Sequence, residues 1–255
     1  MDQGLKEAIG AVGGVSELAR RIGISQPSVS NWLRVPAERV LAIEAATGVA
    51  RTVLRPDLYD RQPDPIDEVD LARAQEYALL ALLLLRAPDG TLLKRMARLR
   101  GDATPLGRLH EALAGAAAKA RPERLDREFA DLFVGIGRGE LVPYGSYYLT
   151  GFLNARPLAR LREDLQALGI ERASGESEPE DHAGLLCETM AGMIHGRFAI
   201  ASEQQRQFFE KHLAPWIGRF FADLETARSA DFYRHVGAAG RLFIDIETEA
   251  FALLG

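Results

Sequence analysis

The chain has 255 residues, of which 47% are hydrophobic and 26% are charged, and its formal net charge is −5. This composition can form a substantial core and excludes a wholly disordered chain. The single cysteine, Cys187, excludes an intramolecular disulfide and favours a reducing, cytoplasmic location.

The most apolar run, residues 77–85, is much shorter than the roughly 20 residues that cross a bilayer, so it predicts a buried helix. The opening residues lack the basic and apolar regions of a secretory signal, and no export is expected.

The charge is unevenly distributed along the chain. Residues 1–55 hold seven Lys and Arg against five Asp and Glu, which gives +2. Residues 56–255 hold 24 against 31, which gives −7 and completes the total of −5. We therefore expect a small N-terminal part that can meet polyanions and an acidic remainder that can meet cationic partners.

Residues 15–34, VSELARRIGISQPSVSNWLR, have the pattern of a helix-turn-helix. The first helix of such a motif needs a small residue where the second helix crosses it, and Ala19 has that place. The turn needs a residue that adopts a positive φ, and Gly23 provides it. Pro27 lies where the second helix would begin, where its missing N–H costs little. The apolar residues that would face the core are Ile24, Val29 and Trp32.

The polar face of the second helix is chemically suited to the major groove of DNA. Gln and Asn can pair with adenine, Ser can reach base edges or phosphate, and Arg can contact guanine or phosphate. The segment resembles the Cro/YdaS-like helix-turn-helix regulators over about residues 4–58. The candidate DNA-binding residues are Ser25, Gln26, Ser28, Ser30, Asn31 and Arg34.

A second interpretation of this segment is a helical hairpin that packs against a partner protein. A net charge of +2 is small beside DNA-binding domains that neutralise many phosphates. One copy would bind DNA weakly, so DNA binding would require a homodimer with two recognition helices about one turn of duplex apart. The sequence leaves both interpretations open.

Residues 55–70 contain three prolines, five aspartates and no sustained helical period. Such a composition is typical of a linker. We therefore predict a helix-turn-helix domain at residues 1–58, a Pro/Asp-rich linker at 59–69 and a helical domain at 70–255.

Beyond the linker nearly every segment has helical spacing of its apolar residues, and strand alternation is nearly absent. Thr104 followed by Pro105 predicts a capped helix through about residue 120, and Arg121 followed by Pro122 predicts another helix start. The expected fold class is all-α, a small helix-turn-helix domain followed by an all-helical bundle. The other expected helices lie at residues 69–85, 91–100, 146–152, 157–168, 179–198, 203–227 and 230–253.

Residues 131–152, DLFVGIGRGELVPYGSYYLTGF, combine an apolar helix end, several glycines and a group of tyrosines. The glycines follow a helix rather than a strand, so they predict a helix C-cap and a turn instead of a phosphate-binding loop. The part that follows them predicts a loop that presents aromatic side chains before the next helix.

A second conspicuous stretch is EPEDH at residues 178–182. Ser177 and Glu180 have the spacing of a capping box, and Pro179 is tolerated in the first turn of a helix. The carboxylates would also face the positive end of the helix dipole. This cap leaves His182 unexplained.

The same stretch allows two chemical alternatives. A metal site could draw on Glu178 and His182 with His195 or Cys187, but no second histidine follows His182 at i+4 and Cys187 lies off its helix face. Catalysis by Asp181 or His182 would need a nucleophile and an oxyanion stabiliser, and the chain lacks a G-x-S-x-G motif. We expect no metal, no cofactor and no enzymatic activity.

Taken in order, the Leu-Phe helix end, the glycine loop, P-Y-x-S-x-Y and E-P-E-D-H closely resemble the TorD/DmsD family of molybdoenzyme maturation chaperones. The resemblance covers about residues 70–252. It implies an all-helical, non-catalytic chaperone that binds an apo-molybdoenzyme of the dimethyl sulfoxide reductase superfamily, often at its N-terminal signal segment, until the molybdopterin cofactor is inserted. Formate dehydrogenase is one candidate client. The family's motif positions in this chain are Pro143, Tyr144, Ser146, Tyr148, Glu178, Pro179, Asp181 and His182.

An acidic helix start beside exposed aromatic rings would suit a basic, partly apolar peptide. In that arrangement Asp181 would pair with an arginine of the client, and Tyr144 or Tyr148 would pack on its side chains. Two alternatives stay open: the tyrosines belong to the core, or Asp181 and His182 form a purely structural hydrogen-bond pair.

Ordinary members of this family consist of the chaperone body alone, so the N-terminal module is a departure. The fusion suggests a coupling between the supply of unfinished client and transcription, transmitted through the linker or through dimerisation. The alternative function is a ligand-responsive transcriptional regulator whose helical body senses a small molecule or nucleotide.

Overall fold

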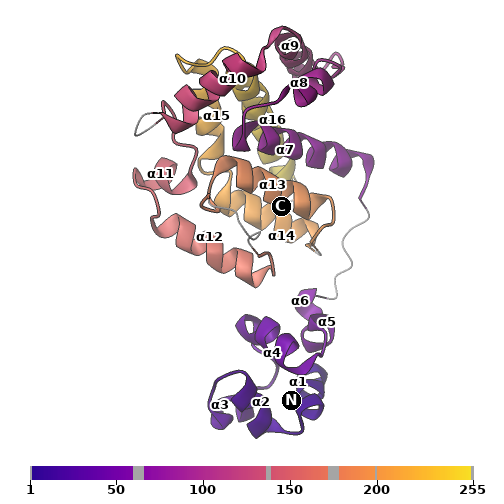
Figure 1. The fold of residues 1–255 in the computed structure, drawn as a ribbon. Helices are drawn as coiled ribbons and strands as arrows, with labels where there is room; N and C mark the ends of the chain where they lie inside the picture. The colour runs from indigo at the N-terminus through magenta and orange to yellow at the C-terminus, as the bar shows by residue number, and fades with distance from the viewer. Residues whose placement is uncertain (1, 60–65, 136–138, 172–177, 199, 254–255) are drawn as a thin grey trace. The chain divides into compact units, whose positions relative to one another are not determined.

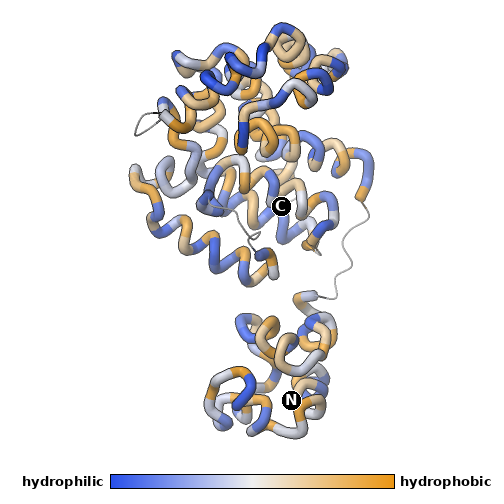
Figure 2. The backbone as a smooth tube through the Cα atoms, in the orientation of Figure 1, coloured by the Kyte–Doolittle hydropathy of each residue, from blue (hydrophilic) through white to orange (hydrophobic). Residues whose placement is uncertain are grey.

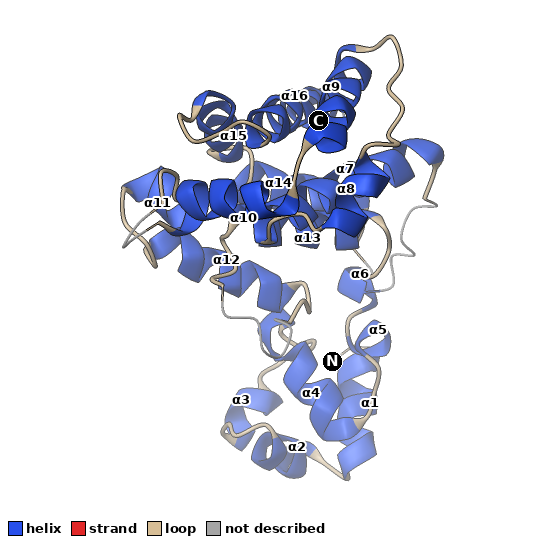
Figure 3. Cartoon of the chain, turned by 45° about the horizontal axis from the view of Figure 1, so that its top comes forward, coloured by secondary structure: helices blue, strands red, loops and turns tan. Residues whose placement is uncertain are grey.

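The computed structural model describes the chain from residue 2 to residue 253 with four internal gaps, and its path runs from helix to helix (Figure 1). Hydrophobic and hydrophilic segments alternate along the helices, as expected where each helix has one buried and one exposed face (Figure 2). The described residues contain no strand, which confirms the all-α class (Figure 3). The residues that the structure does not describe are 1, 60–65, 136–138, 172–177, 199 and 254–255.

The chain divides into two compact units. The first comprises residues 1–64, 164–171 and 199–201, and we call its residues 2–59 the N-terminal module. The second comprises the remaining residues, and we call it the body. The middle of the expected linker lies among the residues that are not described.

The N-terminal module consists of short helices, of which α2 and α3 form the expected helix-turn-helix. The turn between them has Gly23 at a φ of 70°, in the left-handed region that favours glycine. The elements are α1 (Gln3–Val12), α2 (Val15–Arg21), α3 (Gln26–Ser30), η1 (Ala37–Arg39), α4 (Val40–Thr47), α5 (Arg51–Leu54) and α6 (Pro56–Tyr59).

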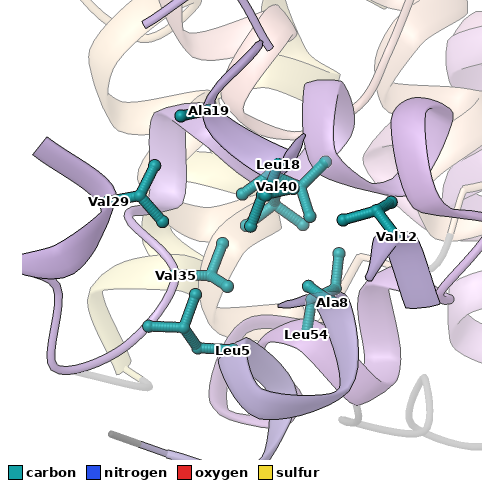
Figure 4. Packing of buried hydrophobic residues seen from close by; sticks show 10 residues of the cluster. Leu5, Ala8, Val12, Leu18, Ala19, Val29, Val35, Val40 and Leu54 are labelled. Carbon is teal, nitrogen blue, oxygen red and sulfur yellow. The ribbon is translucent and has the colours of Figure 1, made fainter. Parts of the chain in front are cut away.

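A small apolar core holds this module together, with side chains from α1 to α5 (Figure 4). Ala19 and Val29 are buried in it, as the helix-turn-helix pattern predicts. Ile24 and Trp32 are half-buried and pack against the same cluster. The buried members are Leu5, Ala8, Val12, Leu18, Ala19, Val29, Val35, Val40, Ile43 and Leu54.

The rest of the described chain adds eleven further helical segments, one of which is a single π-helical turn. They are α7 (Glu68–Leu85), α8 (Gly90–Met96), α9 (Pro105–Lys119), α10 (Pro122–Phe129), η2 (Ala130–Val134), α11 (Gly145–Thr150), α12 (Arg156–Ala167), α13 (Ala183–Ile194), α14 (Ser202–His212), α15 (Ile217–Thr226) and α16 (Tyr233–Leu253).

Two helix pairs form the centre of the body: α7 packs on α13, and α15 packs on α16. The second pair approaches closely because α16 has glycines at the contact. A Cβ atom at Gly237 would collide with the backbone of Glu225, and one at Gly240 would collide with the ring of Phe221. The largest fully buried side chains of the body are Tyr77, Phe209, Trp216, Phe220, Phe221 and Tyr233.

Local sequence signals located several helix ends correctly. Thr104 caps α9, since its hydroxyl oxygen accepts a bond of 3.0 Å from the amide of Gly107. The single helix predicted over residues 203–227 is wrong, because α14 ends at His212 and α15 begins at Ile217. Pro215 lies in the break, and a proline removes a backbone donor and clashes with the preceding turn.

A buried ion pair joins α7 to α16. Arg73 donates to both carboxylate oxygens of Glu247, at 2.7 and 2.9 Å, and Glu247 is only 1% exposed. Arg73 also donates to Asp70 at 2.8 Å, and its guanidinium lies over the Phe251 ring. The two helices are therefore held by a bidentate charged contact within an apolar interface.

No helix in the described part of the chain is long and apolar enough to cross a membrane.

Candidate functional site

The PYxS and EPEDH segments, which are distant in the sequence, lie side by side in the body. Tyr144 and His182 form an isolated antiparallel bridge between them. The two segments are therefore fixed backbone to backbone where α11 and α13 begin. The bonds that flank the bridge run from the amide of Gly145 to the carbonyl of Asp181, at 2.9 Å, and from the amide of Ala183 to the carbonyl of Pro143, at 2.8 Å.

Asp181 is buried, at 3% exposure, and its carboxylate faces inward. Its Oδ2 accepts a bond of 2.7 Å from the amide of Ser146, which lies in the first turn of α11 and has no partner within that helix. This differs from the expected carboxylate that faces outward to a client arginine. The reason is that the buried Ser146 amide needs an acceptor, and Asp181 caps α11 from a distant part of the chain.

His182, which the expected cap left unexplained, is itself the N-cap of α13. Its Nδ1 accepts a bond of 3.1 Å from the amide of Gly184. A nitrogen that accepts a bond carries no proton, so a neutral ring holds its proton on Nε2. The buried ring also lies edge-on to Tyr144, with centroids 5.1 Å apart. His182 therefore organises the motif from inside.

The helix predicted from Pro179 begins four residues later, at Ala183, and ends at Ile194 rather than at residue 198. The backbone before Ala183 pairs with the other motif segment, which keeps it out of the helix. The predicted first-turn position of Pro179 and the predicted capping role of Glu180 are therefore wrong. Ser177, the other half of the predicted capping box, lies outside the described residues.

The outer rim of the motif is half-buried rather than sealed. Tyr144 donates its hydroxyl proton to the carboxylate of Glu178. Burial, reinforced by this carboxylate, raises the pKa of Tyr144, so the phenol stays a donor. Glu180 pairs with Arg162 at 2.8 Å, and Pro179 between the two glutamates is also partly exposed. These are the motif groups that a partner can reach.

Tyr148 is anchored to the body as well as to the motif. Its hydroxyl donates to Asp223 Oδ2 at 2.8 Å, and its ring lies 5.5 Å from that of Trp216 and 6.0 Å from that of Phe220. Burial raises the pKa of Tyr148. Arg219 donates to its backbone carbonyl at 2.8 Å. The alternative of core packing thus applies to much of this side chain, which is half-buried.

The sequence did not single out the apolar side chains just after the tyrosines. Leu149, Phe152 and Leu153 are 41%, 74% and 51% exposed, and we call them the exposed apolar trio. The predicted helix through residue 152 stops at Thr150 because Gly151 adopts a φ of 82°. The sequence signal that could have identified the exposed apolar trio is its position directly after the PYxSxY motif.

In the N-terminal module, the six candidate DNA-binding residues are all exposed on or beside α3. Ser25 Oγ and Ser28 Oγ lie 2.7 Å apart, and Gln26 Nε2 donates to Ser30 Oγ at 2.9 Å. The polar face is therefore accessible, and its groups bond to one another in the absence of a partner. Contact with DNA stays a prediction.

The first helix of this motif is less cationic than its arginines suggest. Glu17 accepts bonds from Arg20 at 2.6 Å and from Arg21 at 2.9 Å. Hydrogen bonds from Arg20 and Arg21 lower the pKa of Glu17 to about 2, so it stays ionised at neutral pH. The positive charge on α2 is partly neutralised, which agrees with the small net charge of the module.

The arrangement of the His, Cys, Asp and Glu side chains bears on the metal and catalytic alternatives. Among the described residues, no three His, Cys, Asp or Glu side chains are grouped so that they could hold a metal ion. Cys187 is fully buried, and burial raises the pKa of its thiol, which disfavours the nucleophilic thiolate. The imidazole of His182 is already used as a helix cap.

Two family profiles match the chain: the nitrate reductase delta subunit family at residues 99–222 and the bacterial toxin YdaS family at residues 5–63. The first range contains both motif segments, and the second contains the helix-turn-helix. The chaperone protein TorD of Vibrio cholerae is 30% identical over 127 residues, which cover 46% of this chain and 56% of TorD. The chain thus spans a little over half the length of TorD.

Other relatives match the two parts separately. A protein of Haemophilus influenzae named "Probable Tat proofreading chaperone DmsD" is 26% identical over 127 residues, which cover 49% of this chain and 61% of that protein. An Escherichia coli protein named "Putative transcriptional regulator YdaS" is 48% identical over 59 residues, 21% of this chain and 60% of that protein. A solved structure titled as a "Putative Redox Enzyme Maturation Protein" from Archaeoglobus fulgidus aligns with a TM-score of 0.47 and 20% identity, over 68% of this chain and 93% of that one.

Proposed function

We propose that this chain, which resembles YdaS in its helix-turn-helix and TorD/DmsD chaperones in its body, is a cytoplasmic, non-catalytic chaperone that binds an apo-molybdoenzyme of the dimethyl sulfoxide reductase superfamily and assists its maturation. The client segment is the N-terminal part of the catalytic subunit, and formate dehydrogenase is one candidate client. The observation that carries the proposal is the family match over residues 99–222, which contains both halves of the joined motif.

We assign two roles to the motif residues. Pro143, Ser146, Asp181 and His182 are buried, and they position the loop through the bonds described above. Tyr144, Tyr148, Glu178 and Pro179 are partly exposed, and they face the client. The Glu178 carboxylate is partly exposed, so a basic group of the client can reach it.

The exposed apolar trio completes this surface. Isolated apolar side chains on a surface are ordinary, but three within five residues, next to a family motif, favour an interaction site. A client segment with basic and apolar residues would bury the Phe152 ring while a cation meets the Glu178 carboxylate. This arrangement uses groups that the structure leaves accessible and does not require Asp181 to turn outward.

Calorimetric titration of the full chain with synthetic N-terminal segments of molybdoenzymes from the same genome tests client binding. We expect one segment to bind, and we expect Phe152→Ser to weaken it by about tenfold, since a large apolar side chain contributes at least about 1.4 kcal/mol at such a site. Ile246→Ser is the matched control, because Ile246 is also exposed, at 41%, but lies on α16. Equal affinity in both variants would remove the trio from the binding surface.

For the N-terminal module we propose DNA binding by a homodimer. The support is the accessible polar face of α3 and the match to YdaS relatives. Sedimentation of the full chain with DNA fragments enriched from a random pool tests both parts of the proposal. We expect two copies of the chain per fragment and half-sites about one turn apart. A stoichiometry of one contradicts the homodimer. No enrichment contradicts DNA binding and favours the protein-binding hairpin.

A further inference from the structure

A pocket of about 520 Å³ lies in the body between α7, α8 and α9. Its size falls within the range of about 300–1,000 Å³ that is usual for small-molecule sites. None of the motif residues lines it. The apolar lining includes Leu79 and Leu82 of α7, Leu92 and Met96 of α8, and Leu99 just beyond α8.

The sequence of α7 explains why this side of the body remains apolar. Residues 77–85 are almost entirely apolar, which predicted a buried helix. The helix packs on α13, and its Leu80 and Leu84 are only 1% exposed. Leu82 on the other side is 37% exposed and opens onto the pocket. The helix therefore has more apolar surface than the body covers.

One end of the pocket is polar. Glu76 of α7 is 92% buried, and its Oε2 lies 2.9 Å from Nε2 of His110 on α9. Its other oxygen, Oε1, is buried and has no hydrogen-bond partner among the residues that the structure describes. A buried acceptor without a donor costs about 1–3 kcal/mol, and more when it is charged. The Glu76 carboxylate therefore retains an unmet demand for a donor.

The remaining charged group of the lining is Arg95 of α8, which is exposed to solvent. Its charge is screened by water, whereas that of Glu76 is not. A ligand that fits both ends has an apolar body for the leucine walls and a nitrogen donor for Glu76. A charged nitrogen is preferred over a neutral one, because His110 contacts only Oε2 and a charge-assisted bond at Oε1 is stronger than a neutral one.

We propose that this pocket binds a small amphiphilic amine, with its apolar part between α7 and α8 and its amino group donating to Glu76. The proposal is independent of client binding, since it uses none of the motif residues. Such a site is what the ligand-responsive alternative requires, and here it belongs to the body of a chaperone.

The test uses two fluorescent probes that differ only at the end of an alkyl chain: dansylcadaverine, which ends in an amine, and dansyl-6-aminohexanoic acid, which ends in a carboxylate. Each is titrated into the full chain, and the anisotropy of directly excited dansyl emission gives the dissociation constant. We expect the amine to bind about ten to a hundred times more tightly, as for one charge-assisted hydrogen bond. Equal affinities, or no saturable binding of either probe, overturn the proposal.

Two variants locate the site. Leu82→Trp fills the mouth of the pocket and should weaken both probes by about tenfold or more, because Leu82 is partly exposed and a larger side chain there need not disturb the core. Glu76→Gln should abolish the preference for the amine. Ile246→Trp, at a similarly exposed position on α16, is the control that should change neither affinity. Unchanged probe binding in Leu82→Trp overturns the proposal even if Glu76→Gln fails to fold. Titration of Leu82→Trp with the client segment shows separately whether client binding persists.

Discussion

The N-terminal module and the body use their conspicuous polar residues in opposite ways. In the module, the polar side chains of α3 are exposed over an apolar core, so residue type and periodicity together indicated which groups face outward. In the body, Ser146, Asp181 and His182 stand out in the sequence and are nevertheless buried. The difference teaches that a conspicuous polar motif can organise a loop from beneath, while less conspicuous apolar neighbours, the exposed apolar trio, lie on the surface.

The largest effect should come from the buried ion pair of the body. Arg73→Met leaves the Glu247 carboxylate buried without its partner, and breaking such a pair typically costs about 3–5 kcal/mol. The chain has two tryptophans, Trp32 in the module and Trp216 in the body. In a Trp32→Phe background, urea unfolding followed by the fluorescence of Trp216 therefore reports on the body.

The control for this prediction is the exposed pair between Arg241 and Glu225. Exposed ion pairs contribute about 0–1 kcal/mol, so Arg241→Met should shift the transition little. Equal losses of unfolding free energy in Arg73→Met and Arg241→Met would show that the burial of Glu247 does not determine the energetic cost of breaking its ion pair. The contrast between exposed polar groups in the module and buried polar groups in the body would then lose its main energetic support.

A smaller loss is expected at the motif itself. Asp181→Ala removes the acceptor of the Ser146 amide, and an unmet buried donor costs about 1–3 kcal/mol. The same fluorescence experiment measures it. Glu180→Ala, which breaks the partly exposed pair with Arg162, should cost less than about 1 kcal/mol. A larger effect from Glu180 than from Asp181 would place the organising contact on the rim.

The pair of His110 and Glu76 predicts a pH dependence confined to the body. The hydrogen bond that His110 donates to the Glu76 carboxylate raises the pKa of His110, with a further contribution from Asp102. The other charged group of the pocket, Arg95, is exposed to solvent. A raised pKa means that the charged histidine stabilises the fold below its unfolded pKa of about 6.5 and that this contribution is lost as pH rises through the folded pKa.

The corresponding measurement compares the wild type with His110→Gln at pH 6 and at pH 9, again through Trp216 fluorescence. The stability difference between the two proteins should be larger at pH 6. A difference that does not change between these values would mean that His110 titrates alike in the folded and unfolded states.

Local signals in the sequence predicted much of this fold. The cap at Thr104 is a local contact and was predicted correctly. The break at Pro215 had a local signal that the helical spacing around it obscured. The late start of α13 had none, because it depends on pairing with a segment far away in the chain. For the same reason the inward Asp181 could not be predicted: the donor that it meets is distant in sequence.

The smallest effect on stability, and the sharpest test of the contrast, belongs to α3. Gln26→Ala removes only an exposed bond to Ser30, so the stability should change by no more than about 0.5 kcal/mol. If the side chain reads a base, affinity for enriched DNA should fall by about 1–3 kcal/mol, as measured by the anisotropy of labelled duplex. Glu38→Ala, exposed but outside α3, is the matched control. Unchanged DNA affinity in Gln26→Ala would mean that accessibility in the module does not indicate function, and the polar face would then be an ordinary solvated surface.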